Sequence, residues 1–263
     1  MEGKLKITEQ DINQFYSEET ASLFQFITGT DQFGIGGEAG VEALARKAGM
    51  TKESKVLDVG SGIGGPARYL AGNYSCQVTG IELSTANFNY AVKKTKESGL
   101  DHLVSFIQGN ALNMSFPDNS FDVVWGVDAW AHIDDKEKLI KECFRVLKKG
   151  GIIAFVDELQ AGEMTEAEKE EAFLCQAVPY LETISGYVKL LEKAGFTILS
   201  SEDVSQEYTK YYYDWQDKME AKKTEIIAQV GSESFNQMRD IFGIMLKYAE
   251  NGKIGEGRFI AKK

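Results

Sequence analysis

Val56–Pro66, with the sequence VLDVGSGIGGP, reads as a buried strand that runs into a glycine-rich turn and then a helix start. The apolar run ends at Gly60, and Gly62 and Gly64 follow at alternate positions. Glycine adopts positive φ and lets the backbone approach a ligand that any Cβ would block. At the carboxyl end of a parallel strand, such a turn opens onto the crevice where doubly wound sheets bind nucleotides. The stretch therefore predicts a nucleotide-type site on an α/β fold.

A second apolar strand follows at residues 77–81 and ends at Glu82. An acidic residue about twenty positions after the glycines is placed to accept hydrogen bonds from ribose hydroxyls. The dinucleotide fingerprint G-x-G-x-x-G needs its third glycine three places after the second, whereas Gly64 comes two places after Gly62. An acidic residue, Asp58, also stands inside the strand end. This spacing disfavours a nicotinamide dinucleotide.

The E/D-x-G-x-G form of the turn resembles motif I of class I S-adenosylmethionine-dependent methyltransferases. Later segments resemble that family in the expected order: residues 106–111 as a third strand with the adenine-contacting turn, 116–125 as the turn into a fourth strand, and 147–156 as the turn into strand five. The resemblance covers about residues 40–160 and implies S-adenosylmethionine as cofactor and S-adenosylhomocysteine as product. The cofactor contacts that it implies are Asp58, Gly60, Ser61, Gly62, Gly64, Glu82, Leu83, Asn110 and Ala111.

Short apolar strands alternate with helical stretches along the chain, and this order independently favours a parallel α/β sheet. The resemblance implies a Rossmann-like class I methyltransferase fold. Its sheet would be seven-stranded and mostly parallel, with the last strand, near residues 252–261, antiparallel beside strand six. We expect one methyltransferase domain over residues 1–263. Its parts would be a helical N-terminal lid (1–37), a cofactor-binding core (38–160) and a C-terminal half with a helical cap and the last strands (161–263).

The composition limits the partners and the compartment. The 263 residues carry a formal net charge of −11, which repels phosphate backbones and anionic lipid surfaces. The sequence has no stretch of about eighteen apolar residues, and its amino terminus lacks the apolar segment of a secretion signal. Cys76, Cys143 and Cys175 lack metal-type spacing. We therefore expect a cytoplasmic monomer or homodimer that acts on a small molecule, without metal, nucleic-acid or membrane partners.

The leader at residues 8–37 is rich in aromatic side chains and resembles that of small-molecule N-methyltransferases. The match runs through QFYSEE at 14–19, FITG at 26–29 and FGIGG at 33–37, and its groups are sarcosine/dimethylglycine and phosphoethanolamine methyltransferases. In those families the leader folds over the cofactor and its early tyrosine closes the active site. The resemblance implies that Tyr16 lies over the substrate and that Gly36 and Gly37 bring backbone near the methionine end of the cofactor.

Asp128 and His132 follow the fourth strand in the segment WGVDAWAH at 125–132. The same families carry an aspartate and a histidine at this spacing. Residues i and i+4 share a helix face, so both side chains could point into one pocket if a helical turn starts here. With Tyr16 they are the catalytic candidates: Asp128 would anchor the cofactor's ammonium or hold an amine, and His132, with an ordinary pKa of about 6.5, would accept a proton. The alternatives are a capping aspartate and a structural histidine.

Aromatic side chains supply candidates for the substrate pocket. Trp130 lies in the segment just described, and Tyr180 ends a polar helical lead at residues 161–180. Consecutive tyrosines on a helix cannot all face one pocket, so we expect one or two of Tyr208, Tyr212 and Trp215 to reach the substrate. The substrate-binding candidates are Trp130, Tyr180 and Tyr212.

These features predict N-methylation of a small amine or amino acid, of the sarcosine or dimethylglycine type, by direct in-line displacement. A phosphorylated acceptor is disfavoured, because phosphate recognition needs arginine, lysine or several amide groups. The position before Asp128 is Val127, and residues 176–179 contain no basic side chain. Two alternatives stay open: a phosphoethanolamine-type N-methyltransferase, and a C- or O-methyltransferase of a lipid, terpene or polyketide. A binding module without activity is disfavoured, because Asp58, the glycines and Glu82 are all present.

Overall fold

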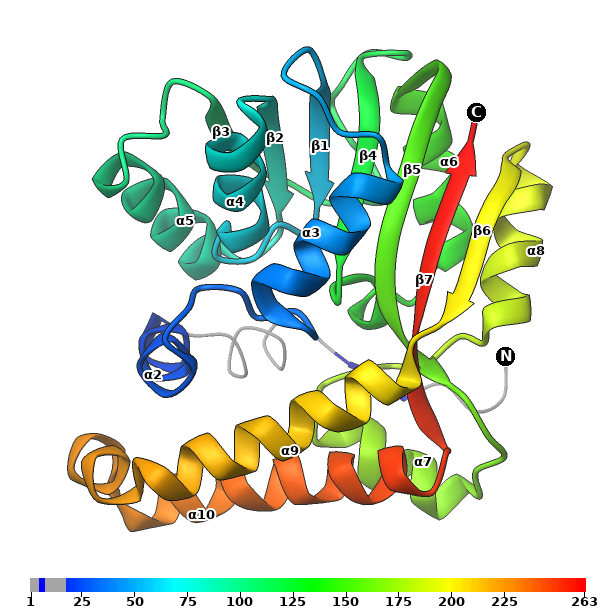
Figure 1. Cartoon of the computed structure of the whole chain (residues 1–263). Coiled ribbons are helices and arrows are strands. Elements are labelled where there is room, and N and C mark those ends of the chain that lie inside the picture. Colours follow the sequence, from blue (N-terminus) through cyan, green and yellow to red (C-terminus); the bar gives the residue numbers. More distant parts are fainter. Residues whose placement is uncertain (1–4, 8–17) are drawn as a thin grey trace.

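The computed structural model describes residues 5–7 and 18–263, and Figure 1 shows a central sheet flanked by helices, with a further group of helices beneath it. The strands form one seven-stranded sheet in the order β3-β2-β1-β4-β5-β7-β6. Parallel pairing joins β3 to β2, β2 to β1, β1 to β4 and β4 to β5, whereas β7 pairs antiparallel with β5 and β6. The predicted sheet is confirmed. The strand bounds are β1 Lys55–Val59, β2 Gln77–Glu82, β3 Val104–Gln108, β4 Phe121–Val127, β5 Leu147–Gln160, β6 Thr197–Asp203 and β7 Ile254–Lys262.

Helices bury both faces of the sheet. Successive side chains of a strand point to opposite faces, and in β1 Val56 belongs to one core cluster and Leu57 to the other, each at most 1% exposed. Helices α3 (Gly37–Lys47) and α4 (Gly65–Tyr74) contribute to the first cluster, and α6 (Lys136–Val146) and α8 (Ile184–Ala194) to the second. Helix α5 (Thr85–Glu97) lies beside β3. Burial on both faces explains why the central strands are continuous apolar runs.

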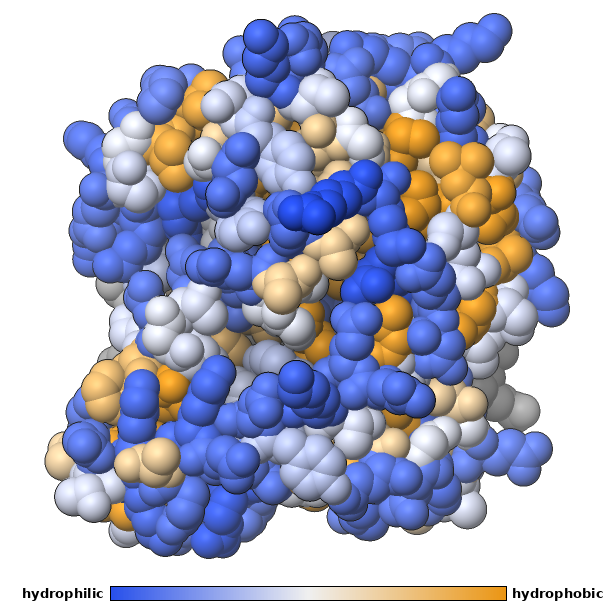
Figure 2. All heavy atoms as spheres, viewed as in Figure 1, coloured by the Kyte–Doolittle hydropathy of each residue, from blue (hydrophilic) through white to orange (hydrophobic). Residues whose placement is uncertain are grey.

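A group of helices faces the carboxyl ends of the parallel strands, and we call it the cap. It consists of α2 (Glu18–Thr28), α7 (Glu166–Leu174), α9 (Ser205–Ala221) and α10 (Lys223–Glu250). Figure 1 shows α9 and α10 side by side along its lower edge, and α10 bends at Gly231, where φ is 83°. In Figure 2 the outer surface over α9 is mostly hydrophilic, while apolar side chains gather over the region of β6 and β7. The cap therefore turns its polar side outward in this view.

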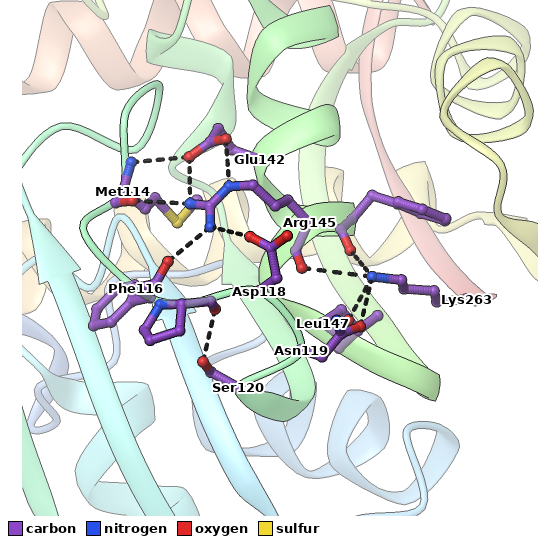
Figure 3. A network of polar contacts seen from close by, with 11 residues as sticks. Met114, Phe116, Asp118, Asn119, Ser120, Glu142, Arg145, Leu147 and Lys263 are labelled. Atoms are coloured by element: carbon purple, nitrogen blue, oxygen red, sulfur yellow. Dashed lines mark hydrogen bonds and ion pairs between the residues drawn. The ribbon is translucent and has the colours of Figure 1, made fainter.

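Arg145 of α6 fixes the turn that leads into β4. Its guanidinium donates to the carbonyl oxygens of Met114 (2.8 Å) and Phe116 (2.7 Å) and to the carboxylates of Asp118 and Glu142 (Figure 3). The carbonyl oxygens of Met114 and Phe116 lie before β4 begins, so no neighbouring strand of the described chain bonds them, and buried carbonyl groups need a donor. Arg145 supplies that donor. The turn expected within residues 116–125 is therefore held mainly from α6, by Arg145 and by Glu142, whose Oε2 atom accepts a hydrogen bond from the Met114 N–H at 3.0 Å.

Two predicted boundaries differ from the structure. Residues 147–151, expected as a turn, belong to β5, where Leu147 pairs with Phe121 across an irregular register. The same strand continues past Val156 to Gln160 because β7 pairs with it as far as Ile254. Strand five is therefore longer at both ends than its apolar run suggests.

None of the helices in the described part of the chain is both long and apolar enough to cross a membrane. Within the same residues no group of three or more His, Cys, Asp or Glu side chains could hold a metal ion. Cys76, Cys143 and Cys175 are free thiols, and burial raises the pKa of Cys76 to about 11 and that of Cys175 to about 12. These thiols are protonated near neutral pH and poor nucleophiles.

Candidate active site

The carboxyl ends of the central parallel strands open into a cavity of about 1150 Å³. Doubly wound sheets bind their ligands at this edge. The cavity is lined on one side by residues at the ends of the strands and on the other by residues of α2, α9 and α10. It brings together eleven predicted side chains or backbone positions: Asp58, Gly60, Ser61, Gly62, Glu82, Leu83, Asn110, Ala111, Asp128, His132 and Tyr212.

The glycine turn after β1 keeps one wall of the cavity open. Gly60 and Gly62 have φ of 76° and 50°, in the region that L side chains rarely adopt. A Cβ on Gly60 would lie 2.6 Å from the Cβ of Ala129, so any side chain there would clash. A Cβ on Gly62 would meet nothing within 4 Å. The backbone at Gly62 can therefore approach a ligand closely.

Glu82, at the end of β2, is tied to this turn. Its Oε2 atom accepts a hydrogen bond from the Gly62 N–H at 2.9 Å, and its Oε1 atom accepts one from the Ser84 N–H at 2.9 Å. Burial raises the pKa of Glu82, and these backbone bonds oppose the rise. A carboxylate offers about four lone-pair sites, so both oxygens can still accept from ribose hydroxyls.

Asp58 lies beside the turn, 1% exposed, and its Oδ2 atom is buried with no hydrogen-bond partner among the described residues. Burial, with a smaller contribution from the charge of Glu82, raises the pKa of Asp58 to about 7. The hydroxyl of Ser61 is also buried and has no hydrogen-bond partner among the described residues. Unpartnered buried polar atoms cost free energy unless a ligand completes them. The ammonium and hydroxyl groups of S-adenosylmethionine would do so, and these residues fit that cofactor.

The adenine end of the predicted cofactor site is lined by Leu83, Asn110 and Ala111. The Oδ1 atom of Asn110 accepts a hydrogen bond from the Leu112 N–H at 2.8 Å, which orients the amide. With Oδ1 held by this bond, the Nδ2 group of the amide could donate to an adenine ring, and Oδ1 keeps a second lone pair.

Asp128 stands on the opposite side of the glycine turn, just after β4. Its φ is 47°, and its Oδ2 atom accepts a hydrogen bond from the Ile35 N–H at 2.7 Å. The Oδ1 atom is buried without a partner in the described chain. Burial is the main cause that raises the pKa of Asp128 well above its ordinary value, and the charges of Glu158 and Asp157 add to it. Among the causes that act on this carboxyl group in the described part of the chain, none is a cation that would balance its charge.

His132 lies on a short 3-10 turn, η1 (Trp130–His132), and not on an α-helical turn that begins at Asp128, so the helical spacing of residues i and i+4 does not apply. Both side chains nevertheless line the cavity. The Nδ1 atom lies 3.1 Å from the carbonyl oxygen of Ala177 and must donate, because a carbonyl only accepts. Burial lowers the pKa of His132, which favours the neutral ring. The neutral ring with a proton on Nδ1 carries its lone pair on Nε2.

Glu158 was not predicted from the sequence. It follows Asp157 near the end of β5, is 7% exposed and lines the cavity, and its Oε1 atom accepts a hydrogen bond from the Tyr208 hydroxyl at 2.9 Å. Burial is the main cause that raises the pKa of Glu158 to about 7. The signal was two acidic residues directly after the apolar run 152–156 at the end of a strand.

Asp157 holds the η1 turn in place from within the core. Its Oδ1 atom accepts hydrogen bonds from the N–H groups of Trp130 (3.1 Å) and Ala131 (3.0 Å), and its Oδ2 atom accepts one from the Tyr187 hydroxyl. Asp157 is fully buried and lies outside the cavity lining. It therefore acts on His132 only through the backbone of the turn.

Two of the aromatic predictions are wrong in position. Trp130 is 1% exposed: its Nε1–H donates to the Val59 carbonyl oxygen at 3.0 Å and its ring stacks on Phe155 at 4.2 Å, so it belongs to the core. The ring of Tyr180 lies 3.8 Å from Nζ of Lys136 and outside the cavity lining. Both side chains satisfy their neighbours in the protein rather than face the cavity.

Three predicted glycine contacts, Gly36, Gly37 and Gly64, also fall outside the lining. Gly64 is the N-cap of α4 with φ of 79°, and a Cβ there would lie 2.6 Å from the ring of Phe106. Gly36 is the N-cap of α3 and Gly37 begins it, and the residues just before them that line the cavity are Phe33, Gly34 and Ile35. A Cβ on Gly34 would lie 2.2 Å from Val127, so this glycine allows the leader to approach Asp128.

The cap contributes Tyr212 and Trp215 to the lining, as expected for one or two of the three aromatic candidates of α9. The third, Tyr208, is fully buried behind Glu158. Tyr16 lies outside the described residues.

The chain is similar to known methyltransferases in sequence. A model of the methyltransferase domain matches residues 57–155. A sarcosine/dimethylglycine N-methyltransferase from Halorhodospira halochloris is 26% identical over 264 residues, 95% of each chain. A sterol 24-C-methyltransferase from Aspergillus fumigatus is 35% identical over 168 residues, 62% of this chain and 45% of the relative.

Among solved structures, phosphoethanolamine N-methyltransferase 2 from Haemonchus contortus in complex with S-adenosyl-L-methionine matches with a TM-score of 0.90 at 25% identity. The match covers 98% of this chain and 60% of that one. The chain thus spans nearly the whole first relative but less than two thirds of the other two. By its methyltransferase domain, its fold and its relatives, the chain is a class I S-adenosylmethionine-dependent methyltransferase.

Proposed function

We propose that this methyltransferase N-methylates an amine by direct displacement. The observation that carries the proposal is the pair of carboxyl groups of Asp128 and Glu158. Both line the cavity, and burial raises the pKa of each. Among the described lining residues Lys6, an exposed side chain, is the only lysine or arginine. A cavity with acidic groups and almost no basic ones suits a cationic acceptor.

S-adenosylmethionine supplies a methyl group on a positively charged sulfur that leaves as a neutral thioether. In the proposed complex Glu82 accepts from the ribose hydroxyls, and Asp58 receives the ammonium group. Leu83, Asn110 and Ala111 contact the adenine. The backbone at Gly62 lies against the same molecule.

The amine must lose a proton before it attacks, because an ammonium nitrogen has no lone pair. In the proposed site Asp128 and Glu158 attract the ammonium form, and a carboxylate or Nε2 of the neutral His132 accepts the proton. The nitrogen that forms the new bond gains the positive charge that the sulfur loses. Tyr212 and Trp215 present aromatic side chains to the cavity, which stabilise a cation through their quadrupoles.

Reaction also needs the nitrogen, carbon and sulfur in line, at about 3–3.5 Å before attack. We assign closure over the reactants to the lid at residues 1–37 and to Tyr16 within it. The relatives named for sarcosine/dimethylglycine and phosphoethanolamine methylation support an amine acceptor. Sarcosine and dimethylglycine are the first acceptors to test.

C-methylation is the second candidate, because the cap side of the cavity is apolar and a relative is named for sterol 24-C-methylation. A carbon acceptor would also develop positive charge and lose a proton, so Asp128 and Glu158 suit both reactions. The nature of the acceptor separates them.

The test measures release of S-adenosylhomocysteine by the purified protein with secondary and tertiary amines, phosphoethanolamine and isoprenoid alkenes. We expect turnover with amines, and a loss of about tenfold or more in kcat/KM for Asp128→Asn, since bonds to charged groups are worth ~1.5–3 kcal/mol. Methylation of the alkene with no methylation of any amine would contradict the proposal.

A further inference from the structure

The cavity continues past Asp128 and Glu158 into a space between α2, α9 and α10. We call it the apolar lobe and define it by Leu23, Phe24, Trp215, Met238, Ile241 and Phe242. The rings of Trp215 and Phe242 stack at 3.9 Å, and the ring of Phe24 lies 5.2 Å from Trp215. This wall is made of rigid aromatic surface rather than of flexible charged side chains.

The size of the cavity argues for an acceptor larger than a methylated glycine. Small-molecule sites usually enclose about 300–1,000 Å³, and this cavity of about 1150 Å³ lies above that range. A cofactor and an acceptor of a few heavy atoms would leave the apolar lobe filled with water. An apolar group on the acceptor would displace that water, and this would make the binding free energy of the acceptor more favourable.

The charges argue against an acceptor that carries a carboxylate or a phosphate. Such an anion would share the cavity with Asp128 and Glu158, and like charges repel. The polar lining residues of α10 that border the apolar lobe, Gln229, Ser234 and Gln237, are uncharged. Only the exposed Lys6, among the described lining residues, could neutralise a carboxylate.

We infer that the acceptor is an amine without an anionic group whose nitrogen lies near Asp128 and Glu158 and whose uncharged, largely apolar substituent fills the apolar lobe. The inference rests on the proposed N-methylation and names its substrate class. A methylated amino acid then fits the nitrogen site but is disfavoured by its carboxylate.

Four secondary amines separate the two parts of the inference. N-methylphenethylamine and N-methylphenylalanine differ by a carboxylate, and dimethylamine and sarcosine differ in the same way without the apolar group. With saturating S-adenosylmethionine, we expect the highest kcat/KM for N-methylphenethylamine. Its value should exceed those of N-methylphenylalanine and of dimethylamine by about tenfold or more, because both buried apolar groups and unpaired buried charges have effects of this size.

Met238→Lys brings a cation to the half-buried edge of the apolar lobe. It should narrow the gap between N-methylphenethylamine and N-methylphenylalanine by about tenfold, as expected when a buried charge gains a partner. Met238→Leu keeps the size and is the matched control. Lys6→Gln should change the kcat/KM of the two phenyl amines less than about twofold, as exposed charges usually do.

The outcomes distinguish this inference from the proposal beneath it. If sarcosine is methylated best, or if Lys6→Gln removes activity only with the carboxylated amines, the inference is wrong and N-methylation stands. If the protein binds S-adenosylmethionine but methylates none of the four amines and does methylate an alkene, both fail.

Discussion

Replacing Glu158 by glutamine should make the protein more stable at alkaline pH and less active. The pKa of the buried carboxyl rises from its ordinary value of 4.5 to about 7. An acid whose pKa is raised on folding binds its proton more tightly in the folded state. The folded protein therefore loses stability as the pH rises from about 4.5 to 7, and the loss persists above that range.

The size of this loss follows from the same values. Each pKa unit corresponds to ~1.4 kcal/mol, so the ionised Glu158 costs ~3 kcal/mol of unfolding free energy at about pH 8.5. Glu158→Gln removes the titratable group but keeps an oxygen that can accept from the Tyr208 hydroxyl, 2.9 Å away in the parent protein. We expect the unfolding free energy of the variant to exceed that of the parent by up to ~3 kcal/mol at about pH 8.5 and to equal it near pH 4.5.

Activity should change in the opposite direction. Loss of a proton acceptor and of a charge beside the nitrogen should lower kcat/KM about a hundredfold. Urea unfolding at the two pH values and release of S-adenosylhomocysteine measure the two effects. Glu170→Gln, an exposed glutamate of α7, is the control and should stay within ~0.5 kcal/mol. A variant that is no more stable at alkaline pH, or that turns over like the parent, would refute the reasoning.

Three further predictions follow from the cofactor site, the acceptor site and the turn before β4. Asp58→Asn should weaken cofactor binding about tenfold or more in titration calorimetry. In the parent protein, cofactor binding should weaken below pH 7, because the pKa of Asp58 is about 7 and the ammonium group must then displace the proton of this carboxyl group. The variant should lose this pH dependence. His132→Asn and Tyr16→Phe should slow turnover while the cofactor Kd changes little, and an equal loss of cofactor binding would remove both from the acceptor site. Arg145→Ala leaves the carbonyl oxygens of Phe116 and Met114 without their donor, which lies at 2.7 and 2.8 Å in the parent protein. The variant should lose ~1–3 kcal/mol of unfolding free energy in urea. An unchanged urea midpoint would contradict the role of Arg145 in the contacts of Figure 3.

The cofactor half of the site was predictable because its determinants are local in sequence. The strand, the glycine turn and Glu82 occupy residues 55–82, and the turn conformation follows from residue type at Gly60 and Gly62. The acceptor half depends on contacts between distant segments. Asp128 is held by the backbone of Ile35, 93 residues away, and His132 by Ala177, 45 residues away.

The errors have the same origin. Glu158 was missed because β5 runs on to Gln160 through its pairing with β7 as far as Ile254, which hydrophobic periodicity does not reveal. Trp130 was misplaced because an indole next to a site can face inward or outward. Here the carbonyl oxygen of Val59 accepts its N–H and fixes it in the core.

The position of β7 in the sheet has a consequence for how the protein forms. β7 comes after all other described elements in the sequence but lies between β5 and β6, and it is the strand with which β6 pairs in the described sheet. As the chain leaves the ribosome, β5 and β6 must wait with open edges until residues 254–262 have been made. Open edges are the surfaces through which nascent chains aggregate. The acceptor site, which depends on the length of β5, can therefore be completed only after this segment has been synthesised.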